Sequence, residues 1–203
     1  MKNTNRLETV HKGVLGEDIV QKVDRSRIML PRWLTNKIAE YDLINEFWGT
    51  KNIKVEKGAD EKLEFFAFSS TVYLNDTSMV VLGGLDDRVP SLPDFSKRAL
   101  HVTQNMENTY DNLYITKEHA EMAYKRGCFA SVYHEGSVYA FGGINYTEKM
   151  LKRCERLNLS TNKWSPITSM NECRKNASAC ALTAETIYIF GGNSNAATLD
   201  SIE

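Results

Sequence analysis

The sequence of 203 residues has little cysteine, little proline and almost no net charge. Its four cysteines are too few for a disulfide scaffold, and no pair stands at the CxxC spacing of a structural zinc site. Lys and Arg total 25 against 26 for Asp and Glu, so the chain has no overall positive field with which to bind nucleic acid. No apolar run approaches the roughly 18 residues of a membrane helix. We therefore expect neither a nucleic-acid nor a membrane partner.

The first ten residues, Met1 to Val10, are polar and charged and lack the apolar core of a secretion signal. Asn-x-Ser/Thr sequons occur at Asn75, Asn145, Asn158 and Asn176. They would be glycosylation sites in a secreted chain, but without a signal segment we interpret them as turn residues. We expect a cytoplasmic protein.

What is present is a repeat. Three diglycines directly follow short runs rich in β-branched and aromatic residues, which predict buried strands. Their first glycines lie 59 and 49 residues apart. A second apolar run and a polar turn precede each one, which predicts a β-hairpin. The three diglycines are Gly83-Gly84, Gly142-Gly143 and Gly191-Gly192, after runs 79–82, 138–141 and 187–190; the preceding runs are 65–74, 128–133 and 177–182.

A second segment also recurs, with a strand, a polar turn and a strand that opens with Trp. Tyr41 stands seven residues before Trp48, and Leu157 stands seven residues before Trp164. The middle unit has no such Trp, and Tyr114 or Ile115 lies near the expected place. That unit also carries a longer acidic connection, 85–95, which accounts for its extra length.

These residues resemble the kelch repeat, whose pattern is a strand ending in Gly-Gly, then Tyr-Asp, then a Trp about seven residues after the Tyr. The match is close over 154–192, where Leu157 and Asn158 replace the Tyr and Asp. It is good over 38–48, partial over 84–125, and covers roughly 32–203. The resemblance implies an all-β fold of kelch-type β-propeller blades, each of four antiparallel strands that cannot bury its faces without neighbouring blades.

The resemblance also implies an incomplete ring. Residues 1–30 stay unassigned, and 31–203 form a partial propeller with repeat boundaries near 31–84, 85–143, 144–192 and a truncated 193–203. The chain holds about three and a half blades, whereas propellers close with roughly 4–8. Either the sequence is a fragment of a longer product, or the ring closes between chains, or it stays open, and we favour a fragment. We expect self-association through open blade edges.

Proteins that resemble this one mostly bind other proteins through loops on one propeller face. Arg126 lies 16 residues before Gly142 and Arg174 lies 17 before Gly191, so we expect both on one rim, where guanidinium groups suit an acidic peptide segment. The alternative is that both arginines pair with carboxylates inside the propeller. The predicted partner-binding residues are Lys125, Arg126, Asn145, Tyr146, Arg174, Lys175, Asn193 and Asn195. The choice between an adaptor, a ubiquitin-ligase receptor and a cytoskeletal contact stays open.

A minority of such propellers are copper radical oxidases, which need two His ligands and a Tyr joined to a Cys. Here His11, His101, His119 and His134 are scattered without ligand spacing, and Glu118 to Glu121 is interpreted as a solvated connection. No Gly-rich phosphate loop occurs. We therefore expect no enzymatic activity, no metal and no cofactor. A copper-dependent oxidase-like propeller and a truncated chain without stable fold are the alternatives.

Overall fold

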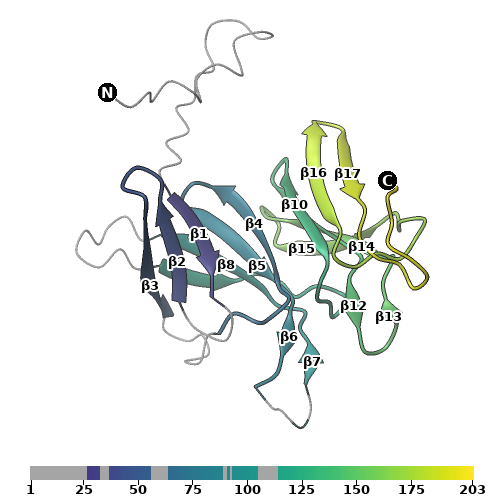
Figure 1. Cartoon of the computed structure of the whole chain (residues 1–203), viewed down its shortest axis with the longest axis horizontal. Helices are drawn as coiled ribbons and strands as arrows, with labels where there is room; N and C mark the ends of the chain where they lie inside the picture. The colour runs from purple at the N-terminus through teal and green to yellow at the C-terminus, as the bar shows by residue number, and fades with distance from the viewer. Residues whose placement is uncertain (1–26, 33–36, 56–63, 89–90, 92, 105–113) are drawn as a thin grey trace, which may run out of the picture.

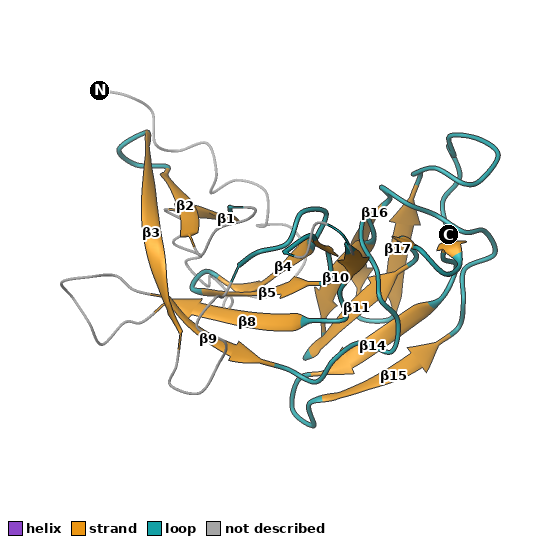
Figure 2. Ribbon diagram, turned by 90° about the horizontal axis from the view of Figure 1, so that it is seen from below, coloured by secondary structure: helices purple, strands orange, loops and turns teal. Residues whose placement is uncertain are grey.

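The computed structural model describes residues 27–32, 37–55, 64–88, 91, 93–104 and 114–203. These residues form strands and no helix, so none of them belongs to a helix that could span a membrane. Four groups of strands follow one another around an open arc, from β1–β3 at one end to β16–β17 at the other (Figures 1 and 2). The all-β fold of an incomplete propeller, expected from the repeat, is confirmed.

The first group is an antiparallel meander that belongs in part to the segment left unassigned from the sequence. β1 already begins at Arg27. The Asp42 carboxylate accepts the backbone N–H groups of Ile44 and Asn45, which closes the turn after β2. The strands are β1 (Arg27–Pro31), β2 (Lys37–Asp42) and β3 (Phe47–Val55).

The second group is a four-stranded antiparallel blade that is joined to the first. β3 runs beyond its hairpin partner, and Ile53 to Val55 pair in parallel with β9. This pairing merges the two groups into one seven-stranded sheet, which the repeat pattern did not predict. The blade consists of β4 (Ser70–Asn75), β5 (Ser78–Leu82), β8 (Ala99–Gln104) and β9 (Tyr114–Glu118), with a small ribbon of β6 (Leu85–Asp86) and β7 (Asp94–Phe95) after the diglycine.

The third and fourth groups repeat this plan. Strand β10 lies against both β4 and β16, so the first strands of successive blades are neighbours. The bridge between Phe190 and Ile202 begins a third strand in the last group. The strands are β10 (Ala130–His134), β11 (Ser137–Phe141), β12 (Ile144–Asn145), β13 (Lys149–Met150), β14 (Cys154–Asn158), β15 (Lys163–Ile167), β16 (Ser178–Thr183) and β17 (Thr186–Phe190).

Strand register shows which residues are equivalent between blades and corrects two details of the sequence interpretation. Leu157 pairs with Trp164, and Val102 pairs with Thr116 at the same place in the preceding blade. Thr116 therefore takes the position of the Trp, not Tyr114 or Ile115, because the longer connection between β8 and β9 breaks the seven-residue spacing. Each complete blade takes two strands before its diglycine and two after it, so boundaries near 84 and 143 fall inside the sheets.

Apolar side chains fill the space between successive blades. On β11, Val138 and Ala140 face the preceding blade, while Phe141 faces the next one. Because side chains alternate along a strand, each blade contributes to two cores. Trp164 packs against the core between the second and third groups and donates its indole N–H to the carbonyl of Ala120 in the preceding linker, at 2.7 Å. The Trp therefore joins neighbouring blades, as the repeat implied.

The diglycines are required by both conformation and space. Gly142 has φ 62° and Gly143 has φ 98°, in the left-handed region that favours glycine. A Cβ on Gly142 would lie 2.4 Å from the carbonyl oxygen of Arg174, and a Cβ on Gly83 would lie 2.4 Å from that of Arg126. The first glycine of the first two pairs thus lets the linker to the next blade pass against the strand end.

We predict that Gly142→Ala destabilises the chain by about 2–5 kcal/mol, because strain at positive φ adds to a backbone clash. Gly136→Ala is the matched control, since Gly136 also has positive φ but no atom within 4 Å of a built Cβ. It should cost only about 1–2 kcal/mol. Urea unfolding of both variants measures the difference, and equal losses would contradict the role of close packing.

Candidate functional site

The structure buries the two arginines that the sequence placed on a binding rim. Arg126 is 0% exposed and Arg174 is 1% exposed. The Arg126 guanidinium donates to Glu155 at 2.8 Å and to the Gly142 carbonyl at 2.7 Å. The expectation that Arg126 and Arg174 contact an acidic partner is therefore wrong, and the alternative of pairing inside the propeller is correct, because both side chains are buried against Glu155 and Glu203.

The same contacts join each blade to the next. The Arg126 carbonyl accepts the N–H of Gly84 in the preceding blade, while its guanidinium holds Gly142 in its own blade. Arg174 repeats this arrangement one blade later, with Gly143 on one side and Gly191 on the other. We name Arg126 and Arg174 the interblade arginines.

Each interblade arginine has a carboxylate partner at an equivalent position. Glu155 also accepts the N–H of Ala123, and Glu203 accepts those of Asn171 and Glu172 as well as two donors of Arg174. Burial lowers the pKa of the Arg126 guanidinium, and Glu155 opposes that shift. Burial alone would raise the pKa of Glu203, but the Asn171 N–H and the Arg174 guanidinium hold it below its ordinary value of 4.5.

The blade built from β4, β5, β8 and β9 replaces this ion pair with an apolar pair. By backbone pairing, Phe66 occupies the place of Arg126, and Leu100 occupies that of Glu155. Both side chains are buried, at 4% and 2% exposure. Because the arginine and its carboxylate are both replaced by apolar residues, no unpaired charge is left in the interior of this blade.

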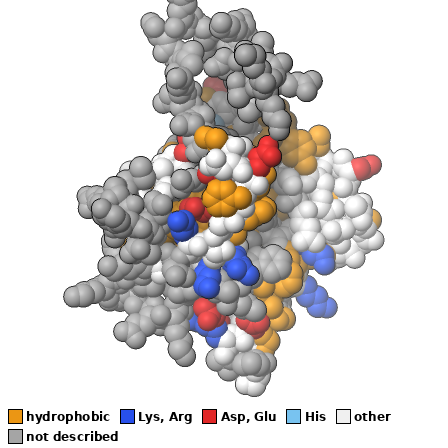
Figure 3. Space-filling view, turned by 60° about the vertical axis from the view of Figure 1, so that its left-hand side comes forward, with side chains coloured by type: hydrophobic (Ala, Val, Ile, Leu, Met, Phe, Trp, Pro, Cys, Tyr) orange, Lys and Arg blue, Asp and Glu red, His pale blue; other side chains and the backbone are white. Residues whose placement is uncertain are grey.

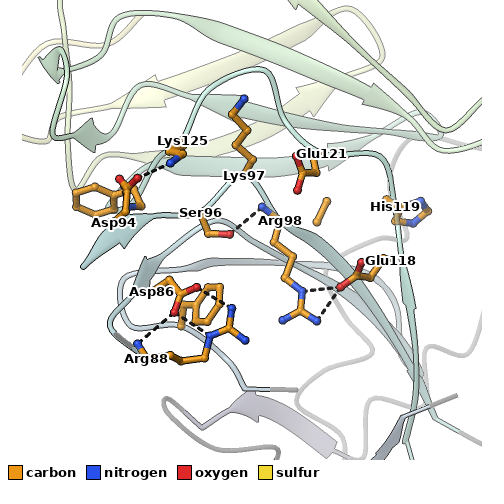
Figure 4. Close-up of a pocket in the computed structure, with 13 residues that line it drawn as sticks. Asp86, Arg88, Asp94, Ser96, Lys97, Arg98, Glu118, His119, Glu121 and Lys125 are labelled. Carbon is orange, nitrogen blue, oxygen red and sulfur yellow. Dashed lines mark hydrogen bonds and ion pairs between the residues drawn. The ribbon is translucent and has the colours of Figure 1, made fainter. Parts of the chain in front are cut away.

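Beside the blade edge lies a polar pocket of about 480 Å³, between the β6–β7 ribbon and the linker after β9 (Figure 4). Its lining is apolar only at Phe66, Phe95 and Ala99. Four acidic and four basic side chains face it, so the pocket carries balanced charge. They are Asp86, Asp94, Glu118 and Glu121, with Arg88, Lys97, Arg98 and Lys125.

Three ion pairs line this pocket. Arg98 contacts Glu118 at 2.8 Å, Arg88 contacts Asp86 at 2.7 Å, and Lys125 contacts Asp94. The hydrogen bond from Arg88 lowers the pKa of Asp86, and that from Lys125 lowers the pKa of Asp94. Both carboxylates are therefore ionised at neutral pH. Lys97 and Glu121 also line the pocket and form no ion pair with another described residue (Figure 4).

The segment Glu118 to Glu121, interpreted from the sequence as a solvated connection, forms one wall. Its carboxylates are exposed, but His119 is half-buried and fixed. The His119 Nδ1 lies 2.9 Å from the Asn162 side-chain oxygen, which also accepts the N–H of Ala120 at 3.0 Å. The His119 ring stacks on His101 with centroids 5.3 Å apart. Burial, followed by the charge of His119, lowers the pKa of His101.

Three predicted partner-binding residues come together at this pocket. Lys125 lines it, and the Asn145 side-chain amide donates to the Lys125 carbonyl at 3.2 Å. Tyr146 is 60% exposed and packs its ring 5.1 Å from that of Phe95, which lines the pocket. Both small ribbons, β6–β7 and β12–β13, project on this side of the molecule (Figure 1).

The other predicted residues lie at the next blade junction. Lys175 and Asn193 exchange backbone hydrogen bonds of 3.0 and 2.8 Å, and the Asn195 amide lies 3.5 Å from the Cys173 sulfur. These positions repeat Gly127, Ile144 and the ribbon after it, one blade further on. They are exposed or half-buried, and their binding role stays a prediction.

The sequence interpretation missed most of the pocket. Asp86, Arg88 and Asp94 lie in the connection 85–95, which was noted only for its length and acidity, and Arg98 follows it; no repeat position marks them. A signal for the interblade arginines was present: Met122 stands four residues before Arg126, as Met170 stands before Arg174, and both methionines are buried.

Residues 125–171 match the family model described as Kelch motif. A fungal alcohol oxidase of the AA5 family, solved in complex with copper, is 16% identical with a TM-score of 0.62, over 84% of this chain and 35% of the oxidase. The protein YjhT is 10% identical with a TM-score of 0.63, over 82% of this chain and 48% of YjhT. The chain thus spans about a third to half of these structures. A search of curated proteins finds no match.

These findings confirm the resemblance to kelch-repeat propellers and correct one expectation. The prediction that the chain is not an enzyme is contradicted, because a copper alcohol oxidase has the same fold. At this identity, the likeness shows the fold alone. Within the described part of the chain, no three His, Cys, Asp or Glu side chains gather into a group that could hold a metal ion.

We predict that Arg126→Phe and Glu155→Leu each cost about 3–5 kcal/mol, because each leaves an unpaired charge in the interior. The double variant places the pair Phe66 and Leu100 of the preceding blade at the equivalent positions. It should unfold at a higher urea concentration than either single variant. If the double variant loses as much free energy of unfolding as the two single variants together, the apolar pair does not replace the ion pair.

A second prediction concerns acid stability. Because the pKa of Glu203 is lower in the folded chain, its ionised form stabilises the fold at pH above 4.5, and this contribution is lost as the pH falls through the folded pKa. Glu203→Gln should therefore melt below the wild type at pH 7, with the gap closing below pH 4. Calorimetry across this range measures the gap, and a gap that is independent of pH would contradict the ion pair with Arg174.

Proposed function

We propose that this segment of kelch-type blades is a protein-interaction module that binds a partner segment at the polar pocket beside the β6–β7 ribbon. The observation that carries the proposal is that Lys125 lines this pocket, while Asn145 and Tyr146 contact the lining residues Lys125 and Phe95. Loops on a rigid scaffold carry binding residues more often than the scaffold itself does.

The chemistry of the pocket supports a partner of mixed charge. The acidic segment expected from the sequence depended on two arginines that are buried. The side chains that line the pocket carry both signs, and Lys97 and Glu121 form no ion pair with another described residue. A peptide that carries one acidic and one basic side chain would satisfy both, because opposite charges placed against each other give specificity and orientation.

Tyr146 supplies the apolar part of this surface. Its ring is 60% exposed and packs against Phe95, with ring centroids 5.1 Å apart. Tyrosines held in this way bind with little loss of side-chain entropy, and Tyr is enriched among residues that dominate binding energy. We expect Tyr146 to contact the partner directly. We propose that the module serves this role as part of a cytoplasmic adaptor.

The test is to identify a partner by affinity capture and to measure its dissociation constant by calorimetry. Tyr146→Ala should weaken binding about 30-fold, the effect of a residue worth about 2 kcal/mol. Glu121→Lys should weaken it by reversing one charge at the opening. Glu185→Lys, at the β16–β17 turn on the other end of a blade, is the matched control and should bind like the wild type.

A partner whose affinity is unchanged by both Tyr146→Ala and Glu121→Lys would place its contact elsewhere and refute this pocket as the binding site. Circular dichroism checks that each variant is folded, which the exposure of Tyr146 and Glu121 favours.

A further inference from the structure

Two histidines stack on each other at the junction between the second and third groups of strands. His101 lies on β8, on the same strand face as Ala99, which packs into the core that these two groups share. His119 follows β9, and its backbone N–H donates to the Ala99 carbonyl at 2.9 Å. The two imidazole rings are nearly parallel, with 17° between their planes and centroids 5.3 Å apart. The pair therefore lies where the second group meets the third.

Asn162 ties the His119 ring to the third group and fixes its tautomer. The Asn162 side-chain oxygen accepts the N–H of Ala120, so the His119 Nδ1, 2.9 Å from the same oxygen, donates to it. A neutral His119 then carries its lone pair on Nε2. The Nε2 atoms of His119 and His101 are both buried and have no hydrogen-bond partner among the described residues. A proton added to the His119 ring would therefore lie at a buried nitrogen without an acceptor, which costs free energy.

On the strand side of the pair, the nearby charge opposes a proton. Lys117 pairs with His101 across the strands, and Val80 on the other neighbouring strand is uncharged. Burial, then the charge of the other ring and then Lys117, lowers the pKa of His101. The β14–β15 turn presents an uncharged amide to the pair, and Lys163 after it is exposed. The stacked arrangement is therefore favoured while both rings are neutral.

The carboxylates that flank His119 in the linker face the polar pocket. Glu118 and Glu121 both line it; Glu118 pairs with Arg98 at 2.8 Å, and Glu121 forms no ion pair with another described residue. Figure 3 shows acidic and basic side chains next to one another at the lower end of the molecule, the end at which the ribbons project in Figure 1. By turning out of the stack, a protonated His119 would gain an exposed ion pair in place of a buried charge. That turn would break the bond to Asn162 and draw Glu118 away from Arg98.

We propose that the stacked pair of His101 and His119 is a pH-sensitive latch of the polar pocket. At neutral pH the latch is closed, and the linker wall of the pocket is held against the third group through Asn162. In acid, a proton on the pair opens the latch, which rearranges Glu118 and Glu121 and weakens partner binding. The effect on partner binding rests on the proposed function, whereas the opening of the latch does not.

The direction of the pH dependence follows from the shift of His101. Because its pKa in the folded chain is lower than the ordinary value of 6.5, the neutral ring stabilises the closed latch at pH above 6.5. This contribution is lost as the pH falls through the folded pKa, since the open state then binds more protons than the closed state. Acidification therefore opens the latch.

Hydrogen exchange of the chain alone tests the latch. The Ala120 N–H donates to Asn162 and the Trp164 indole N–H donates to the Ala120 carbonyl, so both protons report whether the latch is closed. After correction for the intrinsic exchange rate, their protection should fall about 10-fold between pH 7.5 and pH 5.5, as uptake of one proton on opening requires. In His101→Phe it should stay constant, because a phenyl ring keeps the stack and its face attracts a protonated His119.

His134→Phe is the matched control, since it makes the same replacement at the next junction, where the His134 Nε2 lies 2.8 Å from the Ala184 carbonyl oxygen. Its protection should fall with pH as in the wild type, and circular dichroism checks that both variants are folded. Three results would each overturn the latch: wild-type protection that is independent of pH, an equal loss in His101→Phe, or constant protection in His134→Phe.

Partner binding is measured separately, by calorimetry with the partner captured by the wild-type chain. Its dissociation constant should be about 10-fold higher at pH 5.5 than at pH 7.5 for the wild type and should not change in His101→Phe. A pH dependence that His101→Phe retains would refute the effect of the latch on the pocket. Tyr146→Ala and Glu121→Lys test the pocket itself at pH 7.5, with the latch closed, so failure of the proposed function leaves the hydrogen-exchange result unaffected.

Discussion

The buried arginine between consecutive blades is the interaction on which the rest of the structure depends. Its carbonyl holds the diglycine of one blade, and its guanidinium holds the diglycine and a carboxylate of the next. A guanidinium withdrawn from water needs partners for its donors. Here the carbonyls of Gly142 and Arg153 and the Glu155 carboxylate accept from the two terminal nitrogens, while Nε has no partner among the described residues. The blades are therefore locked at fixed relative positions, which the apolar cores between them would not achieve alone, since apolar packing has little directionality.

This lock explains why the candidate site lies where it does. Lys125, which precedes Arg126 in the same linker, lines one wall of the pocket. The position of the pocket therefore follows from the blade junction. His119 and Ala120 are tied to Asn162 and Trp164 of the next blade. A pocket that lies between a blade and the linker to the next blade needs such ties, because a shift of the linker would change the distances between its charges.

The repeat also explains the departures from regularity. The blade that uses Phe66 and Leu100 in place of an ion pair shows that a junction tolerates either chemistry as long as both partners change. Thr116 stands in the Trp position where β3 pairs in parallel with β9, and its buried hydroxyl has no hydrogen-bond partner among the described residues. The uncovered Trp48 and Phe190 are the residues that these rules leave without a neighbouring blade among the described residues.

By itself, the sequence determined the all-β repeat, the strands before each diglycine and the pairing of Tyr41 with Trp48, because these depend on local patterns of apolar residues, turns and glycine. It did not determine where Arg126 and Arg174 point, since a guanidinium on a rim and one in a junction have the same spacing from a diglycine. Only the tertiary structure decided that, because Glu155 and Glu203 approach them across 29 residues of chain. The polar pocket likewise arises from segments that meet only when the blades pack.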